Sequence, residues 1–186
     1  MTERPRLWTA DDWWAIPGEG KLELWYGAPV GIKPVERRLS TFRRFFIEAT
    51  MTSRILAQLT PEQAGLVGPG FGFVNPETGL ALLPPDIAYL RNNRLPEGIE
   101  REEVSLVAPD LAVEILAPMD DRERAAADAA TFLAAGVSIV WVIDPMAQTA
   151  AIHDADRPVR NITVDDSLDG GTLLPELAIP LGDLFA

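Results

Sequence analysis

Two segments of the chain carry the hydrophobic spacing of helices. From about Ser40 to Leu59 there is no glycine or proline, and apolar residues recur every three or four positions, which predicts a long amphipathic helix. A second helix, rich in alanine, is predicted from a capping-box-like start at Asp120 and Glu123 to Gly136. We expect the buried stripe of the first helix to contain these residues: Phe42, Phe45, Phe46, Met51, Ile55 and Leu59.

The remaining apolar runs predict strands. Leu111–Leu116 and Ser138–Ile143 are short and almost continuously apolar, which is typical of central strands that are buried on both faces. Asn75–Gly79 has the composition of a turn between two strands. Weaker runs predict further strands at 22–27, 28–33, 66–74, 80–90, 150–153, 161–164 and 171–174, and a short helix is predicted between Thr9 and Pro17.

This order of elements predicts a single three-layer α/β domain over residues 1–186. Helices should flank a mixed central sheet, with hairpins added at the N- and C-terminal ends. The 186 residues, of which 47% are hydrophobic, suit one core. We find no internal repeat and no low-complexity linker that would divide the chain.

Composition removes several classes of chemistry. The chain has no cysteine and a single histidine, His153, so sites built from thiolates or from two imidazoles are excluded. We expect His153 to lie on the surface. No run of about 18 apolar residues is present, and the N-terminus has no apolar signal region, so we expect a cytoplasmic protein without a membrane span.

Charge is distributed unevenly along the chain. The net charge is −12, which argues against a general affinity for nucleic acids. Basic residues nevertheless prevail in one segment, which forms either a solvated helix face or a local patch that faces a polyanion such as DNA. The basic side chains of this segment are Lys33, Arg37, Arg38, Arg43, Arg44 and Arg54.

The most informative residue is Glu114, which interrupts the apolar run LAVEIL. A carboxylate in a buried strand has to be paired, bind a metal ion or hold a proton, because an isolated buried charge is strongly unfavourable. Asp86 lies in or just before another predicted strand. If the two strands are neighbours, the two carboxylates converge and can hold a hard cation such as Mg²⁺. Alternatively, Asp86 caps a turn after two prolines and Glu114 pairs with an arginine.

Several motifs resemble one known family. The segments PPDIAYL and PDLAVEILAP, followed by an Ala-rich helix and FLAAGVSIVWVIDP, resemble the Uma family of putative restriction endonucleases, which is similar to the PD-(D/E)xK nuclease superfamily. LWTADDWWAIPGEGKLELWYGAPV and LLPELAIPLGDLFA extend the resemblance to both ends of the chain. The resemblance implies a restriction-endonuclease-like core and phosphodiester hydrolysis in DNA. It also implies Mg²⁺ or Mn²⁺ held by Asp86, Glu114 and the backbone carbonyl of Ile115.

The resemblance breaks at the lysine that assists such nucleases. The position two residues after Glu114 is Leu116, and the position on the following helix where Uma sequences carry the lysine is Asp128. One helical turn earlier, where these sequences commonly have an acid, the chain has Arg124. Arg124 and Asp128 are expected either to join the site or to form an ordinary surface ion pair. The nuclease chemistry is therefore expected to be reshaped or lost.

Two further acids match positions associated with the family. Glu48 lies on the long helix, near the position at which Uma sequences often have a histidine. Glutamates on helices sometimes complete such metal sites. Glu23 matches an acid that is common in the N-terminal hairpin.

Three interpretations remain: a metal-dependent DNA endonuclease, an inactive nuclease-fold module that binds DNA or a protein, and an unrelated acidic α/β domain. Because cutting a duplex requires two strand cleavages, a homodimer is expected for the first.

Overall fold

A computed structural model provides the structure of the protein. It describes residues 22–25, 28–31, 42–79, 81–82, 84–95, 105, 107–118 and 120–185. The helix predicted before Pro17 lies outside these residues.

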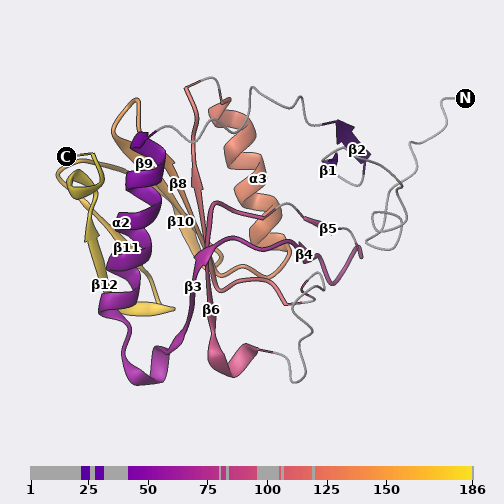
Figure 1. Cartoon of the computed structure of the whole chain (residues 1–186), viewed down its shortest axis with the longest axis horizontal. Helices are drawn as coiled ribbons and strands as arrows, with labels where there is room; N and C mark the ends of the chain where they lie inside the picture. The colour runs from indigo at the N-terminus through magenta and orange to yellow at the C-terminus, as the bar shows by residue number, and fades with distance from the viewer. Residues whose placement is uncertain are drawn as a thin grey trace, which may run out of the picture.

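A six-stranded mixed sheet forms the centre of the molecule (Figure 1). Only β7 and β8 run parallel, and the other neighbouring strands of this sheet are antiparallel. A parallel pair needs a crossover connection, and the helix α3 provides it here. In spatial order the strands are β10 (Arg157–Thr163), β9 (Thr149–Asp154), β8 (Ile139–Asp144), β7 (Leu111–Ile115), β6 (Ile87–Arg91) and β3 (Gly65–Pro69).

The two strands predicted to be central are confirmed. All six residues of β8 are buried, and every residue of β7 except Glu114 is buried. The prediction for His153 is wrong: it lies in β9, pairs with Val140 of β8, and is only 6% exposed. Its position next to a fully buried strand explains this burial.

One face of the sheet packs against α2 (Phe42–Gln58) and the hairpin of β11 (Ser167–Gly170) and β12 (Leu174–Pro180), as Figure 1 shows. The helix is confirmed, but the predicted stripe is wrong in its first half. The buried residues are Ile47, Met51 and Ile55, which follow one line at intervals of four, and burying each of them contributes about 1.5–3 kcal/mol. The three phenylalanines lie off that line: Phe42, Phe45 and Phe46 are 82%, 59% and 39% exposed.

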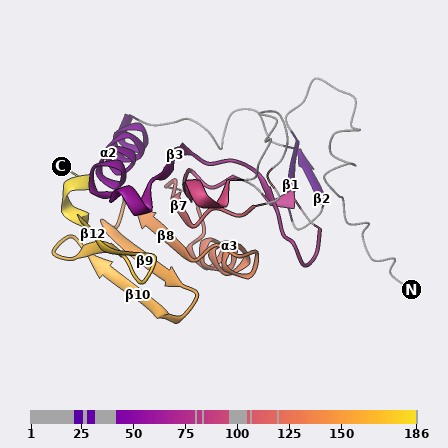
Figure 2. The ribbon, with the colours of Figure 1, turned by 90° about the horizontal axis from the view of Figure 1, so that it is seen from below.

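The opposite face packs against α3 (Arg122–Ala134), so the molecule has the predicted three layers (Figure 2). Ala125, Ala129 and Phe132 contact this face. The helix begins one residue later than the sequence suggested, because Asp121 is the N-cap and accepts a hydrogen bond from the Glu123 N–H at 2.8 Å. Gly136, at φ 99°, follows the helix as expected.

Two of the predicted strands are each divided in two. The segments predicted at 66–74 and 80–90 form β3 and β6 within the large sheet, and a separate pair of β4 (Phe73–Val74) and β5 (Ala81–Leu82). The chain bends at Gly70, where a side chain would collide with the Pro85 carbonyl oxygen. The turn Asn75–Gly79 is confirmed: the Asn75 Oδ1 atom accepts hydrogen bonds from two backbone N–H groups, and Gly79 has φ 69°.

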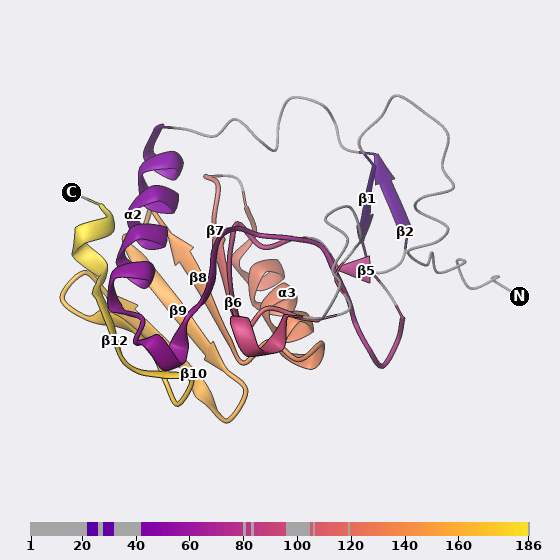
Figure 3. The same cartoon turned by 60° about the horizontal axis from the view of Figure 1, so that its bottom comes forward.

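The terminal hairpins agree with the sequence in kind. β1 (Leu22–Trp25) and β2 (Ala28–Gly31) form an antiparallel pair, and β1 contacts β5 (Figure 3). Near the C-terminus, the strand predicted at 171–174 is wrong, because residues 171–173 form the turn that joins β11 to β12. Short 3-10 helices complete the described elements: η1 (Pro61–Gln63), η2 (Asn92–Arg94) and η3 (Leu181–Leu184).

Candidate active site

The pairing of β6 with β7 brings the two predicted carboxylates together. Ile87 pairs with Val113 in an antiparallel register, so the residue before β6, Asp86, lies opposite Glu114. The Asp86 N–H continues this pairing by donating to the Val113 carbonyl oxygen at 2.9 Å. The condition set by the sequence, that the two strands are neighbours, is therefore met.

The Asp86 carboxylate is held on both of its oxygens. Its Oδ2 atom accepts a hydrogen bond from the Ile115 N–H at 2.7 Å. Its Oδ1 atom accepts one from Nη2 of Arg44, with which it forms an ion pair. The Asp86 side chain is 16% exposed. The acid therefore lies at the end of β7, with its orientation fixed by the backbone of that strand and by a cation from α2.

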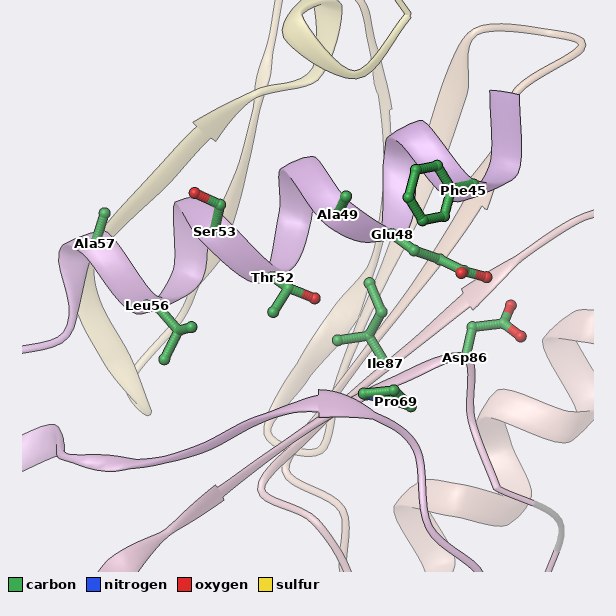
Figure 4. A pocket seen from close by; sticks show the side chains of 10 residues that line it. All are labelled: Phe45, Glu48, Ala49, Thr52, Ser53, Leu56, Ala57, Pro69, Asp86 and Ile87. Atoms are coloured by element: carbon green, nitrogen blue, oxygen red, sulfur yellow. The ribbon is translucent and has the colours of Figure 1, made fainter. Parts of the chain in front are cut away.

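Arg44 reaches this point from the first turn of α2 and links three oxygens. Besides Asp86, its Nη1 atom donates to the Ile115 carbonyl oxygen at 2.8 Å, and its Nε atom donates to Oε1 of Glu48 at 2.9 Å. Charge-assisted hydrogen bonds of this kind are among the strong ones in proteins. In Figure 4 the Glu48 and Asp86 side chains point toward one another from α2 and from the start of β6.

The surroundings of Glu114 disfavour its charged form. Glu114 alternates with Val113 and Ile115, which belong to the core on the α2 side, so it faces the α3 side of the sheet. Burial raises the pKa of Glu114 well above its ordinary value, and the negative charge of Asp86 raises it further. Arg44 opposes this shift, whereas Asp128 and Asp120 add to it. The described acids near Glu114 thus favour either a proton or a cation at this position.

A groove of about 710 Å³ leads to the acids between α2 and the strands β3 and β6 (Figure 4). Asp86 and Glu48 lie at its polar end. The rest of its lining is mostly apolar or small: Phe45, Ala49, Thr52, Ser53, Leu56, Ala57, Pro69 and Ile87. The carboxylates of Asp86 and Glu48 are therefore accessible to a molecule that enters from the side of α2.

The donor atoms at this point suit a hard cation. Asp86, Glu114 and the Ile115 carbonyl offer oxygen ligands, which Mg²⁺ prefers, and two like-charged carboxylates gain from a shared cation. Within the described residues, no group of three or more histidine, cysteine or carboxylate side chains is arranged to hold a metal ion. A divalent ion would therefore depend on two carboxylates and one backbone carbonyl, with water completing its coordination.

The structure places the other predicted site residues as follows. Asp128 is partly buried on α3, close enough to Glu114 to raise its pKa, whereas Arg124 is exposed on the same helix. Glu48 lies beside Asp86, linked to it through Arg44. The position of Glu23 is in β1, but its side chain lies outside what the structure describes.

The described arginines of the predicted basic patch have different partners. Arg44 points into the site, Arg43 donates to the Pro145 carbonyl oxygen at 3.2 Å, and Arg54 pairs with Asp183 at 2.9 Å. Lys33, Arg37 and Arg38 lie outside the described residues.

Arg44 was not predicted as part of the site. Its charge placed it with the basic residues around it, as a possible contact to DNA. One signal was available: Glu48 follows Arg44 by four positions, a spacing that places both side chains on the same side of a helix. This spacing tied Arg44 to the acid that was already considered for the metal site.

Comparison with known proteins shows the family of the chain. The family model of Uma2, described as a putative restriction endonuclease, matches residues 16–182. The chain belongs to this family. None of the curated proteins matches the chain significantly.

One solved structure is similar to the Uma2 fold described here. It is a putative nuclease belonging to DUF820 from Anabaena variabilis, with a TM-score of 0.74 and 22% sequence identity. The alignment covers 95% of this chain and 97% of that chain. At this identity the similarity shows the fold, which is therefore a nuclease-like α/β fold over almost the whole length.

Among the described residues, no helix combines the length and the apolar character that crossing a membrane requires.

Proposed function

We propose that the protein is a metal-dependent DNA endonuclease of the PD-(D/E)xK type. The observation that supports this most is the convergence of Asp86 and Glu114 across neighbouring strands, with Asp86 at the polar end of the groove. Family membership supports the same reaction, the hydrolysis of a phosphodiester bond in DNA.

In this proposal, Asp86, Glu114 and the Ile115 carbonyl would hold Mg²⁺ or Mn²⁺. The bound ion would polarise the scissile phosphate and lower the pKa of the attacking water. The role of the chain is to fix the donors: the Ile115 N–H holds the Asp86 Oδ2 atom at 2.7 Å, which determines how the rest of this carboxylate is presented. Burial beside Asp86 leaves Glu114 with a strong preference for a positive neighbour.

The position of the usual lysine is occupied by Asp128, and this distinguishes the proposed site from the family pattern. The chain has two lysines, Lys21 and Lys33, and both lie outside the described residues. Arg124 and Arg44 are the arginines that the proposal places in or near the site. Because the guanidinium group keeps its proton, an arginine can stabilise negative charge on a phosphate but is a poor general base. We therefore expect slow cleavage.

A second candidate function is supported by the same substitution. A nuclease-fold module that binds DNA or a protein without cutting has no need of the lysine, and Arg44 satisfies Asp86 without any metal ion. In either case we propose DNA as the first partner to test, with Arg43 and Arg54 among the residues that could contact its backbone. For the cutting enzyme, we further propose a homodimer in the cytoplasm.

A plasmid-cleavage assay with Mg²⁺ or Mn²⁺ tests the proposal. We expect slow cleavage by the wild-type protein and a loss of about 100-fold or more in Asp86→Asn and Glu114→Gln, which remove the proposed ligand charge. Asp183→Asn is the matched control, because it also removes one carboxylate, at an exposed ion pair with Arg54. Equal cleavage by all four proteins would contradict the proposal and indicate a contaminating nuclease. DNA binding that is lost at high salt, without cleavage under any condition, would support the second candidate.

A further inference from the structure

Arg44 contacts two of the three groups that the proposed function assigns to a metal ion. Its Nη2 atom donates to the Asp86 Oδ1 atom, and its Nη1 atom donates to the Ile115 carbonyl oxygen at 2.8 Å. A Mg²⁺ ion would have to lie about 2.0–2.1 Å from these oxygens. The guanidinium group already takes the charge of Asp86 and a lone pair on each of these two oxygens, and a divalent cation on the same oxygens would be repelled by it.

We propose that the Arg44 guanidinium is the resident cation of this site, and that a divalent ion binds only after Arg44 has left. This inference rests on the proposed function, because it uses the same ligand oxygens. It goes further by assigning Arg44 as the residue that controls access of the ion to Asp86 and Ile115.

The position of Arg44 on its helix allows such a movement. Arg44 is the third residue of α2, and the residues that α2 buries in the core begin only at Ile47. Its neighbours Phe42 and Phe45 are largely exposed. The Arg44 side chain is itself 25% exposed, so it can turn toward solvent without disturbing the packing of α2 against the sheet.

Glu48 holds Arg44 in place from the same helix. Its Oε1 atom accepts the hydrogen bond from the Arg44 Nε atom, while Asp86 and Ile115 accept from the two terminal nitrogens. In this interpretation Glu48 is a positioning residue for Arg44. The alternative, in which Glu48 is itself a metal ligand, makes the opposite prediction for a neutral Glu48 variant.

Binding of Mn²⁺, measured from the electron paramagnetic resonance signal of the free ion, tests the inference without relying on activity. The proteins are the wild type, Arg44→Gln, Glu48→Gln and the double variant R44Q/D86N. Arg54→Gln is the control, since it neutralises another arginine of α2, which forms an ion pair with Asp183. Circular dichroism and the melting temperature with and without Mn²⁺ establish that each variant is folded.

We expect Arg44→Gln to bind Mn²⁺ at least about tenfold more tightly than the wild type. This gain in affinity should disappear in R44Q/D86N. Glu48→Gln, which keeps both Arg44 and the carboxylate pair, should show a smaller gain. Arg54→Gln should match the wild type. Each variant that gains affinity should also show a larger Mn²⁺-dependent rise in melting temperature than the wild type.

The inference is overturned if Arg44→Gln binds Mn²⁺ no more tightly than the wild type, or if Glu48→Gln binds it more weakly. If the wild type binds Mn²⁺ tightly at a site that Asp86→Asn abolishes, and cleaves DNA, the inference fails while the proposed function stands. If none of the proteins binds Mn²⁺, both the inference and the metal-dependent function fail.

Discussion

The acids at the two ends of β7 have very different surroundings. Just before the strand, Asp110 is fully buried and accepts four hydrogen bonds, at 2.8 to 3.0 Å, from the Arg91 backbone and the side chains of Arg91 and Arg94. At the other end, Arg44 pairs with Asp86 and Glu48, and its charge also acts on Glu114. The first end joins two arginines to one carboxylate. At the second, one arginine faces three carboxylates.

This difference indicates which end has a structural role and which a functional one. A buried carboxylate that is satisfied by paired arginines fixes the geometry of the fold. Carboxylates that share too little positive charge lower the stability of the fold, and they suit a place where a further cation or a substrate binds. The groove opens at the second end, beside Asp86.

The largest effect is expected at the Asp110 end of β7, which we call the closed end because two arginines satisfy its carboxylate. Asp110→Ala leaves the Arg91 and Arg94 guanidinium groups without their shared carboxylate and the Arg91 N–H without its acceptor. We expect a loss of about 3–5 kcal/mol in the free energy of unfolding, measured by urea denaturation. A loss below about 1 kcal/mol would contradict the structural role assigned to Asp110.

At the other end of β7, the open end at Asp86 and Glu114, we expect a substitution to raise the free energy of unfolding. Glu114→Gln removes the charge that Asp86 repels, and we expect it to raise the free energy of unfolding at neutral pH by roughly 1 kcal/mol. Because the pKa of Glu114 is raised in the folded protein, its protonated form stabilises the fold below the ordinary glutamate pKa. This contribution is lost as the pH rises through the raised value.

The advantage of Glu114→Gln should therefore grow with pH across that window. Urea denaturation at several pH values measures it, with Asp183→Asn as the control acid. A difference that shrinks as the pH rises would show that Glu114 is better satisfied than its surroundings indicate.

The smallest effect is expected at the exposed ion pair of Arg54 and Asp183, whose side chains are 50% and 41% exposed. Solvent screens such a pair, and fixing two long side chains opposes it, so Arg54→Gln should lower the free energy of unfolding by at most about 1 kcal/mol. The same denaturation experiment checks this. A loss as large as that of Asp110→Ala would show that burial does not separate the two classes of ion pair.

The sequence identified the open end in part. Glu114 was recognisable because a charged residue in an apolar run has few explanations, and Asp86 because it lies in or just before another predicted strand. That these residues meet depended on the pairing of β6 with β7, which the spacing along the chain does not determine. Arg44 was missed because its charge looked like that of Arg43 beside it. Only the packing of α2 decides which of the two side chains reaches the sheet.

The errors in the fold have a similar origin. Phe42, Phe45 and Phe46 have helical spacing and large apolar side chains, but the line of Ile47, Met51 and Ile55 sets which side of α2 faces the core. The long apolar runs at 66–74 and 80–90 predicted continuous strands. In the structure both runs are divided between two sheets, and Gly70 approaches Pro85 closely, a contact between distant residues that neither run reveals alone.

The outer strands of the large sheet bear on how two copies of the chain could associate. β10 carries Arg157 and Arg160 and has an irregular register against β9, and β3 ends at Pro69, which has no N–H to donate. Charged side chains, irregular pairing and proline are features that discourage strands of separate molecules from joining edge to edge. A homodimer of this protein would therefore have to form through side-chain surfaces, leaving each sheet six strands wide.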